Sequence, residues 1–246
     1  MPSHPPIEVY DELDSTNAEA RRRAEAGDFG PVWITAAVQT AGRGRRGRAW
    51  STQRGNLAAT LLTLTDRPPA EAAQLSFVAA LAACDLADSC LGPGPARLKW
   101  PNDVLVQGRK AVGILVESGT RAEGGLWVAV GIGVNLAYAP HDVERPAVAF
   151  ADHMAAPPPT PLDALEILAV SFDRWRRAWA AEGFAAIASG WTERATGLGQ
   201  RCEARLPNRT VSGIAEGLDN DGALRLRLDD GALERITAGD VFFGSL

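Results

Sequence analysis

A glycine- and arginine-rich segment, residues 40–50, holds the side chains of this sequence best suited to bind an anion. It contains Gly42, Gly44 and Gly47 and four arginines, Arg43, Arg45, Arg46 and Arg48. Glycine lets a backbone approach a ligand closely, and a guanidinium group presents a planar fork of donors that matches a carboxylate or a phosphate. The spacing differs from the Gly-x-x-x-x-Gly-Lys-Ser/Thr of a P-loop. The segment therefore predicts an anion-binding loop of another type.

Two other interpretations of this loop stay open on composition alone: an RGG-like RNA-binding segment and a solvated surface loop. Its position favours a binding loop, because it interrupts two predicted core strands, residues 32–38 and 57–64, whereas RGG segments usually lie in disordered tails. The formal net charge of −5 offers no general positive field for nucleic acid. Any basic cluster must therefore act locally.

The lysines are the second candidate for chemistry. Of the 25 basic residues only Lys99 and Lys110 are lysine, and both lie in one short stretch. A compact ammonium group is not interchangeable with a planar guanidinium where an anion must be approached end-on. Their survival in an arginine-rich chain favours a functional role for at least one, with chance retention on a solvated surface as the alternative.

Several function classes find little support. The three histidines are scattered, and neither His-Glu-x-x-His nor Gly-x-Ser-x-Gly occurs, so a zinc hydrolase or a Ser-His-Asp esterase is not expected. The three cysteines lack metal-ligand spacing and are typical of a reducing compartment. The N-terminus has no secretory signal pattern, and apolar runs such as 77–84 fall short of the roughly 20 residues of a spanning helix. A cytoplasmic protein is expected.

The hydrophobic pattern predicts a mixed β-sheet with helices packed on it, an α+β fold. Thr16 and Glu19, at capping-box spacing, indicate the start of a helix that ends at Gly27. Longer helices are expected over residues 70–89 and 160–180. Alternating or β-branched apolar segments predict strands over residues 7–13, 32–38, 57–64, 96–100, 104–107, 110–117 and 126–134.

From about residue 198 the pattern changes to short strands separated by turns. Turn signals recur about every ten residues, which is typical of a small β-barrel. The predicted strands cover residues 201–206, 210–218, 223–228 and 232–236. The length of 246 residues fits one large domain, residues 1–196, and a small C-terminal one, residues 197–246.

Five motifs follow one another between positions 15 and 135. They are Ser15-Thr16-Asn17, Gln39 to Arg48 followed by Trp50, Lys99-Trp100-Pro101-Asn102-Asp103, Arg109-Lys110-x-x-Gly113-Ile114-Leu115-Val116-Glu117, and Gly131-Ile132-Gly133-Val134-Asn135. Together they resemble the bacterial biotin protein ligases, and the β-rich tail resembles that family's C-terminal SH3-like β-barrel. Fewer than twenty residues precede Ser15, too few for the DNA-binding winged helix of some members. The resemblance implies a class II synthetase-like catalytic domain (the biotin–lipoate ligase type) and a ligase without the repressor.

The resemblance also implies a two-step reaction. The carboxylate of biotin attacks the α-phosphate of ATP to give biotinyl-5′-AMP and pyrophosphate, and a lysine of a biotin carboxyl carrier protein then takes the biotinyl group. Two unit charges 4 Å apart repel by about 4 kcal/mol at an effective dielectric of about 20. Cations already in place would offset this repulsion. Arg43, Arg45, Lys110 and Mg²⁺ are the implied set, and the ligands of the metal stay unidentified.

The matching motifs imply a role for each candidate residue. Biotin would contact Ser15, Thr16, Asn17, Gln39, Arg43, Gly44, Arg45, Lys110 and Gly113. ATP would contact Arg43, Arg45, Arg46, Trp50, Lys99, Asp103, Lys110 and Asn135. Lys110 is the first candidate for catalysis, because it would bridge the carboxylate and the α-phosphate, with Arg43 and Arg45 beside it. Trp50 would stack on adenine, and Gly113 would keep the pocket wall low near the biotin ring.

Alternatives remain for residues and function. Thr16 as a plain helix cap, Trp50 as a core residue, and Lys99 with Asp103 as a structural pair are the simpler readings. A lipoate-type acyl-protein ligase, a nucleic-acid-binding module that uses the Arg-Gly loop, and a biotin sensor without catalysis are the alternative functions. Because a mixed anhydride hydrolyses in water, residues 42–50 are expected to be mobile when empty and to order over the ligand. Neither DNA nor a membrane is an expected partner, and a homodimer through a sheet edge stays open.

Overall fold

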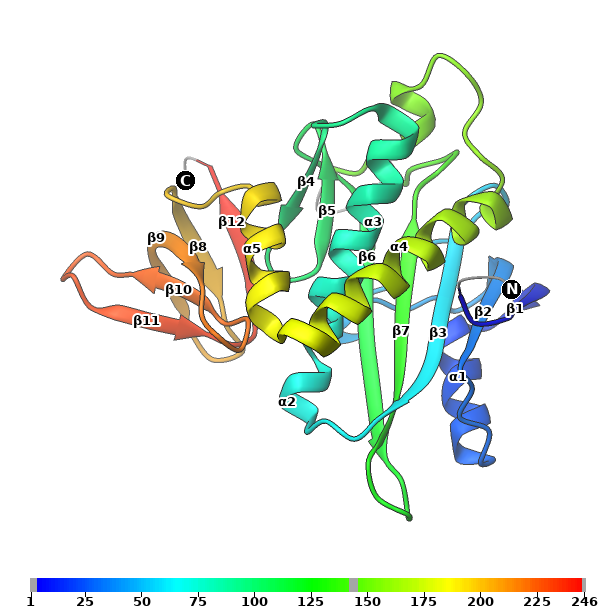
Figure 1. The fold of residues 1–246 in the computed structure, drawn as a ribbon. Helices are drawn as coiled ribbons and strands as arrows, with labels where there is room; N and C mark the ends of the chain where they lie inside the picture. Colours follow the sequence, from blue (N-terminus) through cyan, green and yellow to red (C-terminus); the bar gives the residue numbers. More distant parts are fainter. Residues whose placement is uncertain (1–3, 142–145, 245–246) are drawn as a thin grey trace.

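A seven-stranded mixed sheet forms the centre of the protein (Figure 1). The computed structural model describes residues 4–141 and 146–244. The strands lie in the order β1 (Ile7–Leu13), β2 (Val32–Gln39), β3 (Leu57–Thr65), β7 (Leu126–Val134), β6 (Arg109–Thr120), β5 (Asp103–Val106) and β4 (Ala96–Lys99). Strands β1 and β2 are parallel, and the other neighbours are antiparallel. The expected mixed sheet is confirmed, with boundaries close to those predicted.

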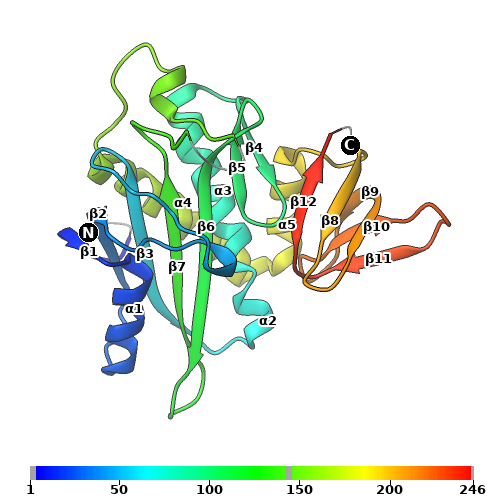
Figure 2. The ribbon, with the colours of Figure 1, turned by 180° about the vertical axis from the view of Figure 1, so that it is seen from behind.

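Helices cover both faces of this sheet (Figures 1 and 2). The short α2 (Pro69–Ala72) leads into α3 (Leu75–Leu91), which packs with α4 (Pro161–Glu182) and α5 (Phe184–Arg194) on one face, and α1 (Thr16–Glu25) packs on the other. Successive residues of a strand point to opposite faces. Accordingly, Leu61 of β3 belongs to the core under α3, whereas Leu62 packs with Ala20 of α1.

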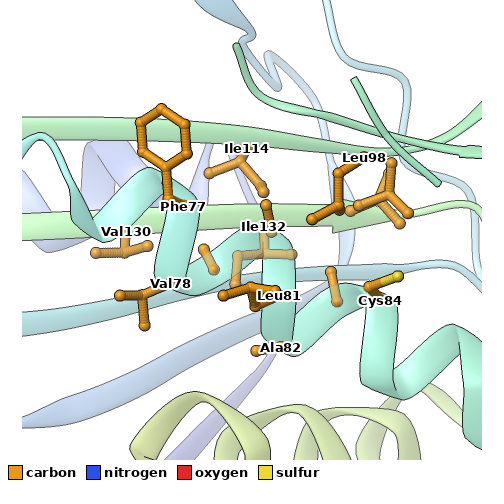
Figure 3. Close-up of a cluster of buried hydrophobic side chains, with 14 of the residues drawn as sticks. Phe77, Val78, Leu81, Ala82, Cys84, Leu98, Ile114, Val130 and Ile132 are labelled. Atoms are coloured by element: carbon orange, nitrogen blue, oxygen red, sulfur yellow. The ribbon is translucent and has the colours of Figure 1, made fainter. Parts of the chain in front are cut away.

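The helix α3 is the centre of the larger core (Figure 3). Phe77, Val78 and Leu81 meet Val130 and Ile132 of β7 across the sheet surface. The segment from α2 to the end of α3 has the length and hydropathy of a membrane-crossing helix, and 67% of its most apolar window is buried inside the protein. Its apolar character is therefore explained by packing against the sheet.

The C-terminal part is a five-stranded antiparallel sheet. Its strands are β8 (Arg201–Arg205), β9 (Thr210–Leu218), β10 (Leu224–Arg227), β11 (Leu233–Ile236) and β12 (Asp240–Phe243), in the spatial order β11-β10-β9-β8-β12. Four of these strands match the prediction, whereas β12 and the helix α5 were not expected. Among the residues that the structure describes, strand pairing leaves β11 and β12 as the two edges, so the expected C-terminal β-structure is a five-stranded antiparallel sheet.

The C-terminal sheet packs against α5 and the β4–β5 turn of the larger part. The indole Nε1 of Trp100, at the β4–β5 turn, donates a 3.0 Å hydrogen bond to the carbonyl of Gly222. Buried residues of the C-terminal strands, among them Leu224 and Val241, share one core cluster with Phe77 of α3. This packing brings β12 next to the loop that follows β2, where the candidate site lies (Figure 2).

Candidate active site

A cavity of about 390 Å³ lies among α1, strands β6 and β7 and the loop after β2. Eleven of the fourteen residues that the motifs proposed line it: Ser15, Thr16, Asn17, Gln39, Arg43, Gly44, Arg45, Trp50, Lys110, Gly113 and Asn135. Arg46, Lys99 and Asp103 are not among the lining residues. Segments far apart in the sequence thus meet at one place, because β2, β6 and β7 belong to one sheet and α1 follows β1 directly.

A buried polar cluster forms the cavity wall at the start of α1. The side-chain oxygen of Gln39 accepts hydrogen bonds from the backbone N–H of Thr16 at 2.8 Å and from its hydroxyl at 3.2 Å. Thr60, on β3, donates to the side-chain oxygens of Thr16 and Asn17 at 2.8 and 2.7 Å. The N-cap residue of α1 is Ser15, and its side chain makes no capping bond. The capping box expected from Thr16 was therefore wrong, and Gln39 supplies the acceptor instead.

Glycines on β7 and β6 leave room for two cavity side chains. A Cβ atom at Gly131 would lie 2.0 Å from the side-chain oxygen of Asn17. Gly113 and Gly133 face each other across β6 and β7, and a Cβ atom at either would meet the Trp50 indole, at 2.8 and 2.3 Å. The half-buried Trp50 therefore rests on a glycine pair at the cavity wall. Gly113 was expected to lower that wall near a biotin ring, and in this structure the space beside it holds Trp50.

Lys110 reaches the cavity from the start of β6. Its Nζ lies 2.5 Å from a carboxylate oxygen of Asp103 and 5.5 Å from the ring centroid of Trp50. The Asp103 side chain is only 3% exposed, and a buried carboxylate is costly without a cationic partner. Asp103 therefore holds the Lys110 ammonium group at the cavity wall. Lys99 and Asp103 were expected to contact ATP or to form a structural pair. They are cross-strand neighbours on β4 and β5, and the Nζ of Lys99 lies 5.6 Å from the Phe242 ring of β12.

Asn135 ties the end of β7 to its neighbours. Its buried amide nitrogen lies 3.5 Å from the carbonyl of Lys110 and 3.4 Å from that of Val148. The contact bridges β6 and the segment after residue 146. Asn135 thus supports the backbone of Lys110 as well as lining the cavity.

The glycine-arginine loop folds back on itself over the cavity. The N–H of Gly44 donates to the carbonyl of Arg48 at 2.7 Å, and Arg43 and Ala49 form an isolated antiparallel bridge. A 3₁₀ turn, Arg45–Gly47, closes the fold with Arg46 in the left-handed region at φ 56°. Here the loop has a defined conformation, and its mobility in the empty protein stays a prediction.

Three of the loop arginines are held by groups outside the loop. Arg45 donates 3.1 Å hydrogen bonds to the side-chain oxygen of Asn102 and to the carbonyl of Gly239. Burial lowers the pKa of Arg45, and the carboxylates of Asp240 and Asp103 act in the opposite direction. Arg46 and Arg48 both pair with Asp240, as described below.

Polar residues that the motifs did not single out for binding line the cavity or support its lining residues. Asn102, next to Asp103 in its motif, donates its amide to the carbonyl of Ile114 at 2.6 Å as well as accepting from Arg45. Thr60 is fully buried in β3, between the apolar residues Ala59 and Leu61, which was a usable signal for a polar cluster. Asp240 lies in a four-residue strand and had no local signal.

The arrangement can hold a molecule that carries both neutral polar groups and negative charge. Amide and hydroxyl groups gather at the α1 wall, whereas Arg43, Arg45, Arg48 and Lys110 supply cationic donors elsewhere in the same cavity. Such preplaced cations stabilise charge that develops on carboxylate and phosphate oxygens. Among residues 4–141 and 146–244, no group of three histidine, cysteine or acidic side chains could hold a metal ion on its own.

Comparisons with known proteins agree with this geometry. The model of the biotin/lipoate A/B protein ligase family matches residues 14–135, and that of the biotin protein ligase C-terminal domain matches residues 197–244. The biotin–[acetyl-CoA-carboxylase] ligase of Paracoccus denitrificans is 46% identical over 94% of this chain and 98% of its own length. The corresponding ligase of Mycobacterium tuberculosis is 34% identical over 96% of this chain and 88% of its own.

Among solved structures, the biotin protein ligase of Aquifex aeolicus, in complex with biotin and ATP, has a TM-score of 0.81. It is 22% identical to this chain, and the alignment covers 97% of this chain and 99% of that one. This likeness shows a shared fold over both sheets. Since close sequence relatives match along nearly their whole length and the motifs converge on one cavity, the chain belongs to the biotin protein ligase family.

Proposed function

We propose that the protein activates biotin with ATP to biotinyl-5′-AMP and transfers the biotinyl group to a lysine of the biotin carboxyl carrier protein of acetyl-CoA carboxylase or a related carboxylase. One observation carries the proposal: Arg43, Arg45 and Lys110 line the same cavity as the buried polar cluster at the start of α1. An acid bound by that cluster can therefore present its carboxylate to cations that also meet a phosphate.

In the first step a carboxylate oxygen of biotin forms a bond to the α-phosphorus, and the bond to the bridging oxygen breaks with its electron pair on pyrophosphate. No proton needs to move, because the carboxylate is already ionised at neutral pH. The residues have to bring two anions together and hold them in line. Such positioning can lower the activation free energy by up to about 7–11 kcal/mol. Lys110 would contact the carboxylate and the α-phosphate, with Arg43 and Arg45 on the remaining oxygens.

The polar cluster would orient the neutral end of biotin. Ser15, Thr16, Asn17 and Gln39 supply hydroxyl and amide groups at one wall, where a ureido group needs both donors and acceptors. Trp50 and Asn135 would contact the nucleotide, the first by stacking. In the second step the carrier's lysine nitrogen bonds to the acyl carbon, the nitrogen loses a proton, and AMP leaves with the electron pair of the acyl–oxygen bond.

Mg²⁺ would enter with the nucleotide. This ion usually keeps several waters and binds one or two carboxylates together with phosphate oxygens. The described residues that line the cavity include no carboxylate, so phosphate oxygens and water would supply most of the ligands of the ion. The metal would neutralise phosphate charge beside Lys110.

The organisation and setting follow from the same proposal. Residues 1–196 would form the catalytic domain and residues 197–246 the C-terminal domain. The described cysteines, Cys84, Cys90 and Cys202, are free thiols, which suits a cytoplasmic protein. Strand β1 is a sheet edge with Val9 64% exposed, so a second copy or the carrier itself would have backbone groups available for pairing.

The test is incubation with biotin, ATP, Mg²⁺ and a carrier domain, followed by the mass of the carrier. We expect the mass to rise by one biotinyl group, only when ATP is present. A gain with lipoate in place of biotin would identify a lipoate ligase instead. Binding of biotin without release of pyrophosphate from ATP would indicate a biotin sensor without catalysis. Steeply salt-dependent binding of RNA or DNA would indicate a nucleic-acid-binding module instead.

A further inference from the structure

One acidic residue of the C-terminal sheet joins that sheet to the glycine-arginine loop. Asp240, the first residue of β12, pairs one carboxylate oxygen with Arg48 at 3.0 Å and the other with Arg46 at 3.4 Å. These partners lie 192 and 194 positions away in the sequence. The preceding residue adds a third contact, because the carbonyl of Gly239 accepts the 3.1 Å hydrogen bond from Arg45.

The environment of Asp240 makes these pairs more than a surface contact. Its side chain is 10% exposed, whereas those of Arg46 and Arg48 are about 40% exposed. Exposed ion pairs contribute little, but a mostly buried carboxylate depends on its cationic partners. Two guanidinium groups of the loop therefore offset the desolvation cost of the buried Asp240 carboxylate. The same ion pairs restrain Arg46 and Arg48.

The restrained arginines include two that face the cavity. Arg45 and Arg48 line it, whereas Arg46 does not. Arg46 was placed among the ATP contacts by resemblance, and here its guanidinium points to Asp240. The described partners of Arg45 and Arg48 outside the loop are Asn102 and residues of the C-terminal sheet. The position of these cations thus depends on a strand that contributes no residue to the cavity lining.

We propose that Asp240 is a positioning residue for the adenylation step. Together with the Gly239 carbonyl it restrains Arg45 and Arg48 at the cavity wall, so that less of the freedom of the loop has to be lost when biotin and ATP bind. The inference rests on the proposed function, because the phosphates of ATP are the anions that these arginines would meet. Preorganised donors act without reorganisation at the moment of reaction. Loss of Asp240 should therefore weaken ATP binding more than it weakens biotin binding.

The experiment compares Asp240→Asn with the wild type in biotin-dependent exchange of pyrophosphate into ATP. Asparagine keeps the shape of the side chain and removes its charge. We expect the KM for ATP to rise about tenfold, which corresponds to about 1.4 kcal/mol, with a smaller change in the KM for biotin. Asp240→Glu should recover most of the loss, because it restores the charge. Asp229→Asn is the matched control, since Asp229 forms an exposed pair with Arg201 in the same sheet.

A second measurement does not depend on activity. Trypsin cleaves after arginine, so the ligand-free proteins are digested and cuts within residues 43–48 are followed by mass. Asp240→Asn should be cut there several-fold faster than Asp229→Asn. Exchange by the wild type shows first that the proposed function holds. If the wild type exchanges and Asp240→Asn matches the Asp229→Asn control in KM for ATP and in cleavage, the proposal is overturned. Equal losses in Asp240→Asn and Asp240→Glu, with lower melting temperatures in both, would assign Asp240 a purely structural role and overturn it as well.

Discussion

The glycine pair under Trp50, Gly113 and Gly133, offers a test of how far activity depends on the position of the Trp50 indole. In Gly133→Ala a single methyl group is added to β7, at a position where the backbone does not require glycine, since its φ is not positive. The new Cβ would lie 2.3 Å from Nε1 of Trp50, 2.4 Å from Cε2 and 2.7 Å from Cζ2. All three distances are far below an ordinary contact, so the indole must move.

The size of the effect follows from these distances. Carbon atoms pack at about 3.5–4.0 Å, so the indole has to retreat by about 1–1.5 Å from β7. A displacement of about 1 Å at a reacting site can reduce the rate by about 100-fold. We expect kcat/KM for adenylation to fall by between about 10-fold and 100-fold. The free energy of unfolding should change little, because Trp50 is half-buried at the wall of an open cavity.

The assay is biotin-dependent exchange of pyrophosphate into ATP, measured for Gly133→Ala, Trp50→Ala and the double variant. If the methyl group acts by displacing the indole, it should do little once Trp50 is gone, and the two effects will not add. Gly133→Ala should then alter the Trp50→Ala activity by less than about threefold. Wild-type activity in Gly133→Ala, or full additivity in the double variant, would refute the reasoning.

Three further predictions follow from other parts of the structure. Lys110→Arg keeps the charge but not the compact shape that fits beside Asp103, so adenylation should fall by about 100-fold or more, and full activity in the exchange assay would remove Lys110 from the chemistry. Biotin with ATP should slow protease nicking of residues 42–50, and equal cleavage with and without ligands would exclude a lid. Burial alone would raise the pKa of Asp85, but hydrogen bonds from Ser171, Arg194 and a tryptophan hold it below its usual value. Asp85 therefore stabilises the fold above the unfolded-state pKa, near 4, and this contribution is lost as the pH falls through the lower folded-state pKa. Asp85→Asn should lower the free energy of unfolding by about 2 kcal/mol at pH 7, and urea titrations should show the difference shrinking below pH 4.

Local patterns predicted most of the sheet because each strand carries its own signal. The alternation in β1 and the apolar runs of β3 and β7 follow from which faces of these strands are buried. The hydrophobic pattern therefore predicts them directly. The helix α5 was missed although Phe184, Ile187 and Trp191 have helical spacing and are buried. Strand β12, of only four residues, has no such pattern and exists because it pairs with β8.

The candidate site was predictable to the extent that its chemistry requires particular residue types. Guanidinium groups among glycines indicated an anion site, and the resemblance of the motifs to the ligase family singled out Arg43, Arg45 and Lys110 within it. The partner of each residue could not be predicted. The side-chain oxygen of Gln39, rather than a helix-cap side chain, accepts the hydrogen bond from the N–H of Thr16, and Asp103 pairs with Lys110. Strands β2, β5 and β6 bring these groups together in the tertiary structure.

The amino-acid sequence alone determined the mixed sheet and the loop that carries the arginines, because propensity, burial and charge are properties of short segments. The class of chemistry was inferred from the resemblance of five motifs to the ligase family. Only the tertiary structure decided that the Trp50 indole rests on Gly113 and Gly133 and that Asp240 holds Arg46 and Arg48. Those contacts depend on strand register and on how two sheets pack. Register and packing result from the free energy of the whole chain, so they cannot be predicted from any short segment alone.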